Sequence, residues 1–334
     1  MTDKINIGID AMGGDNSPKK IIDGIEISLK KNSNNFFLLY GNQEIIKKEL
    51  SNKKEVIKKC EIINTKDIIT DEESPLTATK RGKESSMWKS IESQKKDKTH
   101  ITLSAGNTGA LLVMSRLILK TIDGVDKPAL AALWPNKKNM NVVLDLGANI
   151  ECNEKNLCDF ASMGTALFRS LFPMDEPNVA LLNVGLEEHK GKDFLKKAFL
   201  TLKENKNKNF KFNGYVEGNH IMDGDVNVII TDGFTGNIAL KTAEGTANFI
   251  QKNLKESLNM FSMLLSFNSL KKFKQRFDPR KYNGAIFLGL EGPVVKSHGA
   301  TDALGFAYSI DVCSKIINSN LIEKIKSNLI TVDR

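Results

Sequence analysis

Short apolar runs alternate with glycine-containing turns and helix-like stretches along most of the chain. Six runs predict strands: Ile5–Asp10, Phe36–Tyr40, Ile101–Ser104, Val142–Leu146, Val179–Val184 and Val226–Ile230. They are nearly continuous in apolar character, which is typical of a parallel sheet covered by helices on both faces. The alternation of strand, loop and helix predicts a doubly wound α/β sandwich, in which ligands bind beyond the carboxyl ends of the strands.

The length of 334 residues, with 40% apolar and 26% charged side chains, predicts one α/β catalytic domain over 1–334. Such a composition excludes dominant disorder and rod-like folds. No apolar run approaches the roughly 18 residues of a membrane span. The opening MTDKINIGID lacks the apolar region of a secretion signal, so we expect a cytoplasmic protein.

The cysteines and the net charge bear on two kinds of site, a metal site and a nucleic-acid interface. The four cysteines are scattered, and with four histidines they give no metal-ligand spacing, so no metal is predicted. The net charge of +8 comes mostly from lysine, because only six of the 48 basic residues are arginine. Nucleic-acid readers favour arginine and interleaved aromatics, so no nucleic-acid partner is predicted.

Two glycine loops each follow a predicted strand and precede a predicted helix. They are Ser-Ala-Gly-Asn-Thr-Gly at 104–109 and Asp-Gly-Phe-Thr-Gly-Asn at 232–237. Neither matches a nucleotide-binding motif, so no nucleotide cofactor is predicted. Backbone N–H groups, a capping side chain and a helix N-terminus suit an anion. One such loop is commonly just a capped turn, but two on one edge of the sheet favour a shared phosphate pocket.

Other polar residues lie where predicted strands end. Lys190 stands in a glycine-bounded loop, where its ammonium can reach a phosphate, or it is one more surface lysine. His298 can donate to an anion or shuttle a proton, or it is structural. Asp10, Asp145 and Asp232 are expected to orient loops rather than to attack substrate.

Six segments, in order, carry a resemblance to a known family. They are IDAMGGD at 9–15, SAGNTGA at 104–110, LDLGAN at 144–149, NVGLEEHKG at 183–191, DGFTGNIALKTAEG at 232–245 and LGLEGPVVKSHG at 288–299. Together they resemble the signature blocks of the PlsX phosphate acyltransferase family and span nearly the whole chain.

The resemblance implies an enzyme that moves a long-chain fatty acyl group from acyl carrier protein to inorganic phosphate. The acyl phosphate product would serve phospholipid synthesis, with a glycerol-3-phosphate acyltransferase acting next. It also implies a Rossmann-like α/β/α sandwich, related to phosphotransacetylases and isocitrate dehydrogenases, that works as a homodimer without a cofactor.

Candidate roles follow from the loops and the resemblance together. The residues expected in catalysis are Lys190, Asn237 and Asn107. The residues expected to bind phosphate and the acyl carrier are Asp10, Gly13, Gly14, Gly106, Thr108, Gly109, Asn149, Asp232, Thr235, Gly236 and His298. We expect bound phosphate to attack the thioester directly; the other route is an acyl-cysteine on Cys152.

The segment 247–281 differs from the rest of the chain. Its apolar residues repeat at helical spacing: Ile250, Leu254, Leu258, Phe261 and Leu265. Eight basic residues against two acidic ones give it a local charge of +6. The pattern suits an interfacial helix or a helix pair on a partner subunit. The resemblance favours peripheral contact of a dimer with anionic lipid at the inner face of the cell membrane, through Leu254, Leu258, Phe261 and Leu265.

Two other functions remain open at this point. A short-chain phosphotransacetylase-like enzyme acting on acyl-CoA would share the phosphate loops. A membrane-bound scaffold for lipid enzymes would need only the amphipathic segment.

Overall fold

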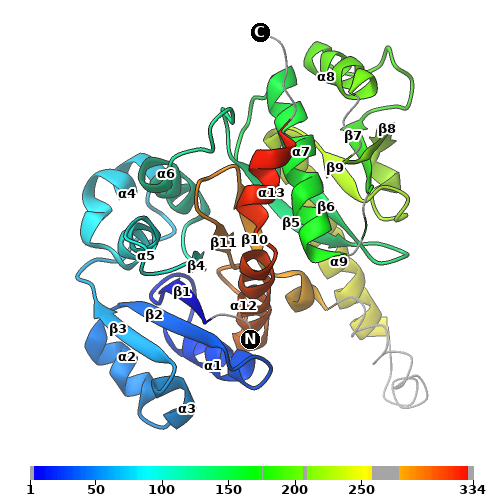
Figure 1. Ribbon diagram of the computed structural model, residues 1–334. Helices are drawn as coiled ribbons and strands as arrows, with labels where there is room; N and C mark the ends of the chain where they lie inside the picture. Colours follow the sequence, from blue (N-terminus) through cyan, green and yellow to red (C-terminus); the bar gives the residue numbers. More distant parts are fainter. Residues whose placement is uncertain (1–3, 173, 175, 206–208, 258–277, 330–334) are drawn as a thin grey trace.

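A computed structural model describes residues 4–172, 174, 176–205, 209–257 and 278–329 (Figure 1). Within them eleven strands form one sheet, in the order β3-β2-β1-β4-β11-β10-β5-β6-β9-β7-β8. The strands are β1 Ile5–Asp10, β2 Asn35–Gly41, β3 Cys60–Asn64, β4 Ile101–Ser104, β5 Ala129–Pro135, β6 Met140–Leu144, β7 Asn178–Asn183, β8 Lys211–Glu217, β9 Val228–Ile230, β10 Ala285–Leu288 and β11 Val294–Lys296.

The sheet consists of two parallel blocks that run in opposite directions. β3, β2, β1, β4 and β11 are parallel to one another, and so are β6, β9, β7 and β8. Antiparallel pairing of β10 with β11 and β5, and of β5 with β6, joins the blocks. The sequence prediction of a parallel sheet is correct within each block and wrong at the junction.

The junction was missed because it depends on pairing β5 with β10, which lie far apart in the sequence. β5 and β6 form a hairpin whose turn is closed by a hydrogen bond of 3.1 Å from Asn136 N to Asn139 O. β10 ends at Leu288 and is followed by Gly289, whose φ of +88° lies in the region that glycine adopts without strain. The six predicted strands are all present, with ends that differ by a few residues at most.

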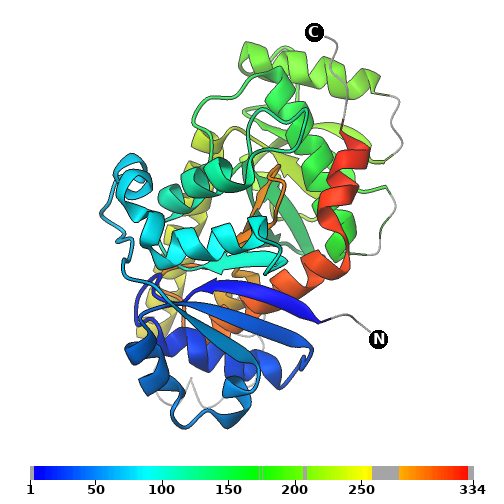
Figure 2. The ribbon, with the colours of Figure 1, turned by 60° about the vertical axis from the view of Figure 1, so that its left-hand side comes forward.

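Helices cover both faces of the sheet, as predicted (Figure 2). The helices are α1 Lys19–Leu29, α2 Gln43–Leu50, α3 Lys54–Ile57, α4 Pro75–Arg81, α5 Ser86–Lys95, α6 Thr108–Leu119, α7 Glu154–Leu171, α8 Asp193–Glu204, α9 Gly233–Ser257, α12 Ala303–Asn318 and α13 Leu321–Asn328, with short 3₁₀ turns at Gly82–Glu84, Gly218–His220 and Pro279–Tyr282.

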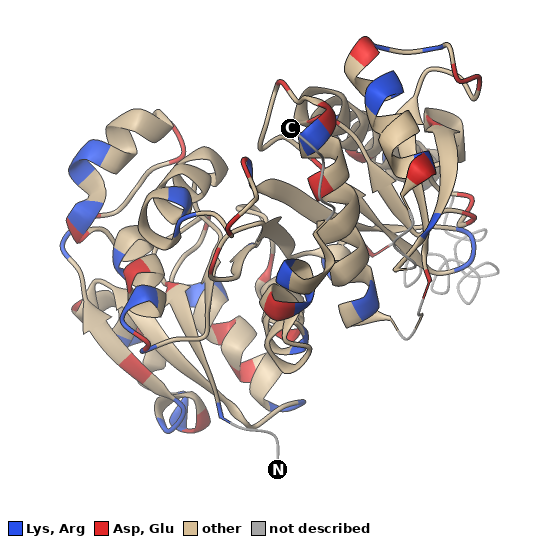
Figure 3. Ribbon diagram, turned by 45° about the horizontal axis from the view of Figure 1, so that its top comes forward, with Lys and Arg blue, Asp and Glu red and all other residues tan. Residues whose placement is uncertain are grey.

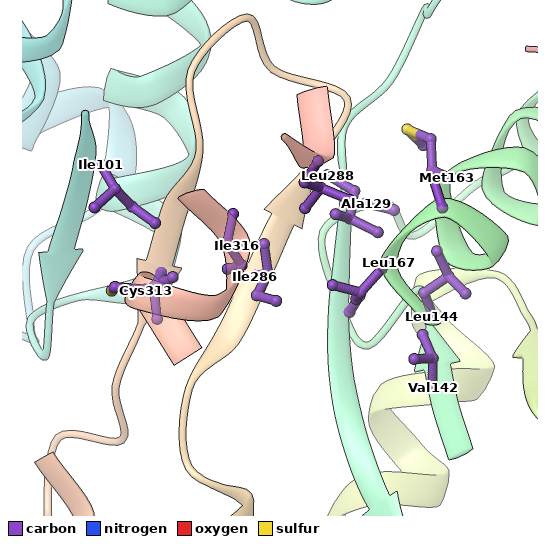
Figure 4. Close-up of a cluster of buried hydrophobic side chains, with 14 of the residues drawn as sticks. Ile101, Ala129, Val142, Leu144, Met163, Leu167, Ile286, Leu288, Cys313 and Ile316 are labelled. Atoms are coloured by element: carbon purple, nitrogen blue, oxygen red, sulfur yellow. The ribbon is translucent and has the colours of Figure 1, made fainter. Parts of the chain in front are cut away.

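Strand residues alternate between two hydrophobic clusters, one on each face. Val228 and Ile230 of β9 belong to the cluster with α1, α7 and α12, and Ile229 belongs to the cluster with α5 and α6. Figure 4 shows part of the first cluster, where Leu167 of α7 lies beside Leu144 of β6. Burial on both faces explains why these strands are apolar at every position.

Helix α9 runs unbroken through a stretch that the sequence analysis divided in two, a short helix after the glycine loop and a separate amphipathic segment. From Gly245 to Ser257 every side chain that the structure describes is exposed, and the helix leaves the body of the protein (Figure 1). Leu254 lies on this exposed stretch, whereas Leu258, Phe261 and Leu265 lie outside the described residues. Elsewhere basic and acidic residues are interspersed over the ribbon (Figure 3).

Candidate active site

The loops after β1, β4 and β11 meet at the carboxyl ends of three neighbouring parallel strands. Asp10, Ser104 and Lys296 are register partners across these strands. Ser104 Oγ donates a hydrogen bond of 2.7 Å to the buried Asp10 carboxylate, and burial raises the pKa of Asp10. A Cβ on Gly13 would lie 2.6 Å from Gly106 N, so this close packing of the two loops requires glycine. We call Asp10–Gly14, 104–109 and Lys296–Gly299 the first loop cluster.

Asn107 and Thr108 begin α6 within this cluster. Asn107 Oδ1 caps the helix by accepting from Ala110 N at 3.0 Å, and its Nδ2 donates to three carbonyls of the loop 70–73 at 2.9–3.2 Å. These contacts support a positioning role for Asn107. The backbone N–H groups of Thr108 and Gly109 have no acceptor within the described part of the chain, and the Thr108 side chain is exposed. They are donors available to an anion.

His298 lies at the edge of the first loop cluster. Its Nδ1 accepts from Ala300 N at 3.2 Å, which leaves the proton of the neutral ring on Nε2. Burial, and then the charge of Lys296, lower the pKa of His298. A neutral ring with a free N–H donor is suited to hydrogen bonding with an anion.

Two lysines of this cluster were not assigned a role from sequence. Lys296 Nζ donates to Ala105 O at 3.1 Å and to Ser297 O at 2.7 Å, and burial lowers its pKa to about 8. Lys20 of α1 is 5% exposed, its Nζ donates to Gly299 O, and burial lowers its pKa. The signal for Lys296 was its place in the last signature segment, but Lys20 looks like any other lysine of a polar stretch.

A second cluster, Asp145–Asn149 with Asp232–Asn237, follows β6 and β9, and we call it the second loop cluster. The prediction of a loop at 232–237 is wrong, because 233–237 already form the start of α9. The buried Asp145 carboxylate accepts from the backbone N–H groups of Gly147, Ala148 and Asn149 at 2.7–3.2 Å, and burial raises the pKa of Asp145. A Cβ on Gly236 would lie 1.9 Å from Asp145 O, so the two loops of this cluster also meet through glycine.

Most polar side chains of the second loop cluster hold its own loops. The Asn149 amide donates to Pro128 O at 2.7 Å and to Asp145 at 2.8 Å. The buried Asp232 carboxylate accepts from Thr235 N at 2.9 Å and Thr235 Oγ1 at 2.8 Å. These hydrogen bonds fit the expectation that the strand-end aspartates orient loops, which stays a prediction. Asn237 differs, because it is the fifth residue of α9 and its side chain is exposed.

Lys190 lies on the loop after β7, and its side chain is partly exposed. Its Nζ forms an ion pair of 2.8 Å with Glu187, which lowers the pKa of that carboxyl. Asn183 Nδ2 donates to Lys190 O at 3.1 Å and ties the loop to the strand end. Among the contacts of the described residues, none joins the Lys190 side chain to either loop cluster.

The two glycine loops do not share a sheet edge through parallel strands, contrary to expectation. Three antiparallel pairings separate β4 from β9, so the two strands run in opposite directions. Helix α9 provides a connection instead. It begins in the second loop cluster, and the charges of its Glu244 and Lys241 act on the pKa of His298 in the first.

Cys152 is the candidate for a covalent route. Burial, assisted by the charge of Asp145, raises the pKa of the Cys152 thiol to about 11. A thiol is nucleophilic as the thiolate, so this environment disfavours attack by Cys152 near neutral pH.

Across the described residues no group of three His, Cys, Asp or Glu side chains is placed to hold a metal ion. Within the same residues no helix combines the length and apolar character needed to cross a bilayer.

Comparisons with known proteins agree with this arrangement. A family model described as "Fatty acid synthesis protein" matches residues 5–324. A phosphate acyltransferase of Pelagibacter ubique (strain HTCC1062) is 57% identical over 334 residues, covering 98% of this chain and 100% of that protein. A phosphate acyltransferase of Rhodospirillum rubrum is 42% identical, covering 99% of this chain and 96% of that protein.

Solved structures resemble the fold at low sequence identity. The EutD phosphotransacetylase from Staphylococcus aureus matches with a TM-score of 0.63 at 15% identity, covering 95% of this chain and 94% of that one. A branched-chain phosphotransacylase from Enterococcus faecalis V583 matches with a TM-score of 0.60 at 12% identity, covering 94% and 99%. The expected α/β sandwich of the phosphotransacetylase type is thereby confirmed.

Proposed function

Because the chain belongs to the phosphate acyltransferase family, as its signature segments indicated, we propose that it transfers a long-chain acyl group from acyl carrier protein to inorganic phosphate. The products are acyl phosphate and free carrier. Family membership supports the acyltransferase activity, and the loop geometry supports an oxyanion substrate. Residues 1–334 act in this proposal as one catalytic domain, and no cofactor takes part.

The observation that carries the proposal is the meeting of distant signature segments. The segments around Asp10, Ser104 and Lys296 form the first loop cluster, through register pairing and the bond between Ser104 and Asp10. The segments around Asn149 and Gly233 meet in the second, where Gly233 N donates to Asn149 O at 2.8 Å. Each cluster opens a helix, whose N-terminus favours negative charge.

The reaction needs a held phosphate and a stabilised oxyanion. The N–H groups that begin α6, together with Lys190, hold phosphate while one of its oxygens attacks the thioester carbonyl carbon. The exposed Asn237 amide then donates to the oxyanion of the tetrahedral intermediate. As the C–S bond breaks, the electron pair stays on sulfur, and the thiolate takes the proton that hydrogen phosphate loses. Losing one oxyanion donor typically reduces the rate by about 10²–10³.

A turnover assay with palmitoyl-loaded carrier tests the proposal directly. Product should appear only with inorganic phosphate, and hydroxylamine should trap it as an acyl hydroxamate. Thioester loss that does not depend on phosphate would indicate hydrolysis and refute the proposal. Turnover with acetyl-CoA but not with loaded carrier would instead identify a short-chain phosphotransacetylase, the function of the protein whose structure this fold resembles.

The exposed part of α9 supports an additional proposal about partners. Phe249 is 69% exposed, Ile250 53% and Leu254 37%, and these side chains lie on a helix that has left the body of the protein. Exposed apolar residues on a helix face of this kind call for a covering partner. We propose that a second copy of the chain and an anionic membrane surface at the cytoplasmic face cover this helix, so that acyl phosphate is released near a glycerol-3-phosphate acyltransferase.

Paired variants test the contribution of this face. Leu254→Asp should weaken self-association measured by light scattering, or weaken flotation with anionic vesicles at low salt. The matched control is Gln251→Asp, which adds the same charge at an exposed polar position of the same helix. Equal behaviour of both variants and the unmodified chain in both assays would exclude a role for Leu254 in either contact.

A further inference from the structure

The first loop cluster contains the half-buried Lys296, and the buried Lys20 of α1 reaches the same cluster. Burying a lysine is unfavourable unless its charge is compensated. Lys296 and Lys20 bond to backbone carbonyls of Ala105, Ser297 and Gly299. Within the described residues neither lysine forms an ion pair with a carboxylate, although the charge of Asp71 acts on both. The hydrogen-bond partners of both ammonium groups are uncharged carbonyls, and the carboxylates that act on them without an ion pair are Asp71 on both, Asp15 on Lys20 and Asp10 on Lys296.

The position of these groups is set by the sheet. Lys296 is the last residue of β11 and pairs in register with Ser104 at the end of β4. Lys20 approaches from α1 and reaches the loop after β11 at Gly299. The two ammonium groups are near enough for the charge of Lys20 to lower the pKa of Lys296. Like charges held together in this way are stabilised by an anion placed between them.

Lys296 and the start of α6 keep hydrogen-bond donors that their internal bonds do not use. An ammonium has three donors, and Lys296 donates two of them to Ala105 O and Ser297 O. Ala105 is followed within four residues by Thr108 and Gly109, whose N–H groups have no acceptor among the residues that the structure describes. The carbonyl that accepts from Lys296 Nζ thus lies three and four residues before the N–H groups of Thr108 and Gly109.

We propose that Lys296 and Lys20 bind the phosphate substrate, with the third Lys296 donor and the N–H groups that begin α6 contacting its oxygens. This inference rests on the proposed function for the identity of the anion. It adds two residues to the phosphate site that the signature analysis placed on 107–109 and Lys190.

Phosphate groups could reach this site from two sources, inorganic phosphate and the phosphodiester of the carrier's prosthetic arm. Two ammonium charges match the dianion of inorganic phosphate better than a singly charged diester. We therefore assign the site to inorganic phosphate.

The test measures phosphate binding to the full chain by calorimetry, with inorganic phosphate alone, and then steady-state kinetics. The variants are Lys296→Met and Lys20→Met, which keep an unbranched apolar side chain. Lys19→Met is the matched control, because Lys19 is the neighbour of Lys20 on α1 and is largely exposed in an ion pair with Asp23. Circular dichroism and thermal unfolding establish that each variant is folded.

We expect the affinity for phosphate to fall about tenfold or more in Lys296→Met and in Lys20→Met, as for the loss of a charged hydrogen-bond donor. The KM for phosphate should rise in parallel, with the KM for loaded carrier within about twofold, and Lys296→Arg should recover part of the loss. Lys19→Met should match the unmodified chain.

Several results would overturn the assignment. Wild-type phosphate affinity in a folded Lys296→Met variant would mean that the lysines only tie loops together. A rise confined to the KM for loaded carrier would assign the site to the phosphodiester. Failure of the proposed function is distinguishable, because the unmodified chain would then bind phosphate through these lysines without forming acyl phosphate.

Discussion

Phosphate binding should weaken as pH rises through the pKa of Lys296. Burial, with a smaller contribution from Lys20, lowers this pKa from 10.5 to about 8, while Asp71 and Asp10 oppose the shift. A group with this pKa is about 90% charged at pH 7 and about 10% charged at pH 9. If only the ammonium form binds phosphate, the KM for phosphate rises about tenfold between those values. Phosphate is itself almost wholly dianionic above pH 8 and adds little to the upper part of this slope.

The assay is the KM for phosphate at saturating loaded carrier, measured from pH 7 to 9.5. Lys296→Arg provides the decisive comparison, because arginine stays charged throughout this range. Its KM for phosphate is expected to be higher at pH 7 but nearly flat with pH, and Lys19→Met should keep the full slope. A flat profile in the unmodified chain, or the same slope in Lys296→Arg, would refute the reasoning.

Three further substitutions separate the roles of other residues. Lys190→Ala should reduce turnover by about 10²-fold with an unchanged unfolding midpoint, since Lys190 is partly exposed and paired with Glu187; near-normal turnover would remove it from the site. Cys152→Ala should keep turnover within about threefold. Complete loss of turnover in this variant, together with an acyl-enzyme isolated from the unmodified chain, would establish the cysteine route. Gly236→Ala should lower the free energy of unfolding by more than about 3 kcal/mol in urea titrations, because its Cβ would clash with Asp145 O. Gly245→Ala is its control on the exposed part of α9, where it should stabilise by roughly 0.5–1 kcal/mol; equal effects would contradict the packing argument.

The parts of the fold that the sequence predicted are those fixed by local pattern. β1 and β4 were predicted with their observed ends, because each is a short apolar run that stops at a polar residue before a glycine turn. β5 and β10 were missed, since their place in the sheet depends on the antiparallel pairing of two segments more than 150 residues apart, Ala129–Ala131 with Ile286–Leu288. The same reversal explains why two loops of similar sequence follow strands of opposite direction.

The sequence predicted which loops form the candidate site, but it did not predict the contacts of their side chains. Asn107 and Asn149 stand in the right places, but their amides bond to carbonyls of their own and neighbouring loops. Lys20 was not identifiable, because its burial depends on a contact with Gly299, a residue 279 positions away. The end of a strand follows from the local sequence. The burial of a lysine depends on long-range packing, which the local sequence does not predict.

The carboxylates and the lysines have separate roles, which explains how an anion site can contain buried carboxylates. Asp10 and Asp145 lie behind their loops, and each accepts hydrogen bonds from the loop or strand that it holds. In the proposed site the anion is held by the N–H groups that begin α6 and by Lys20 and Lys296, whereas the buried Asp10 carboxylate is bonded to Ser104. Loss of a carboxylate should therefore appear first in stability, and loss of a lysine first in phosphate affinity.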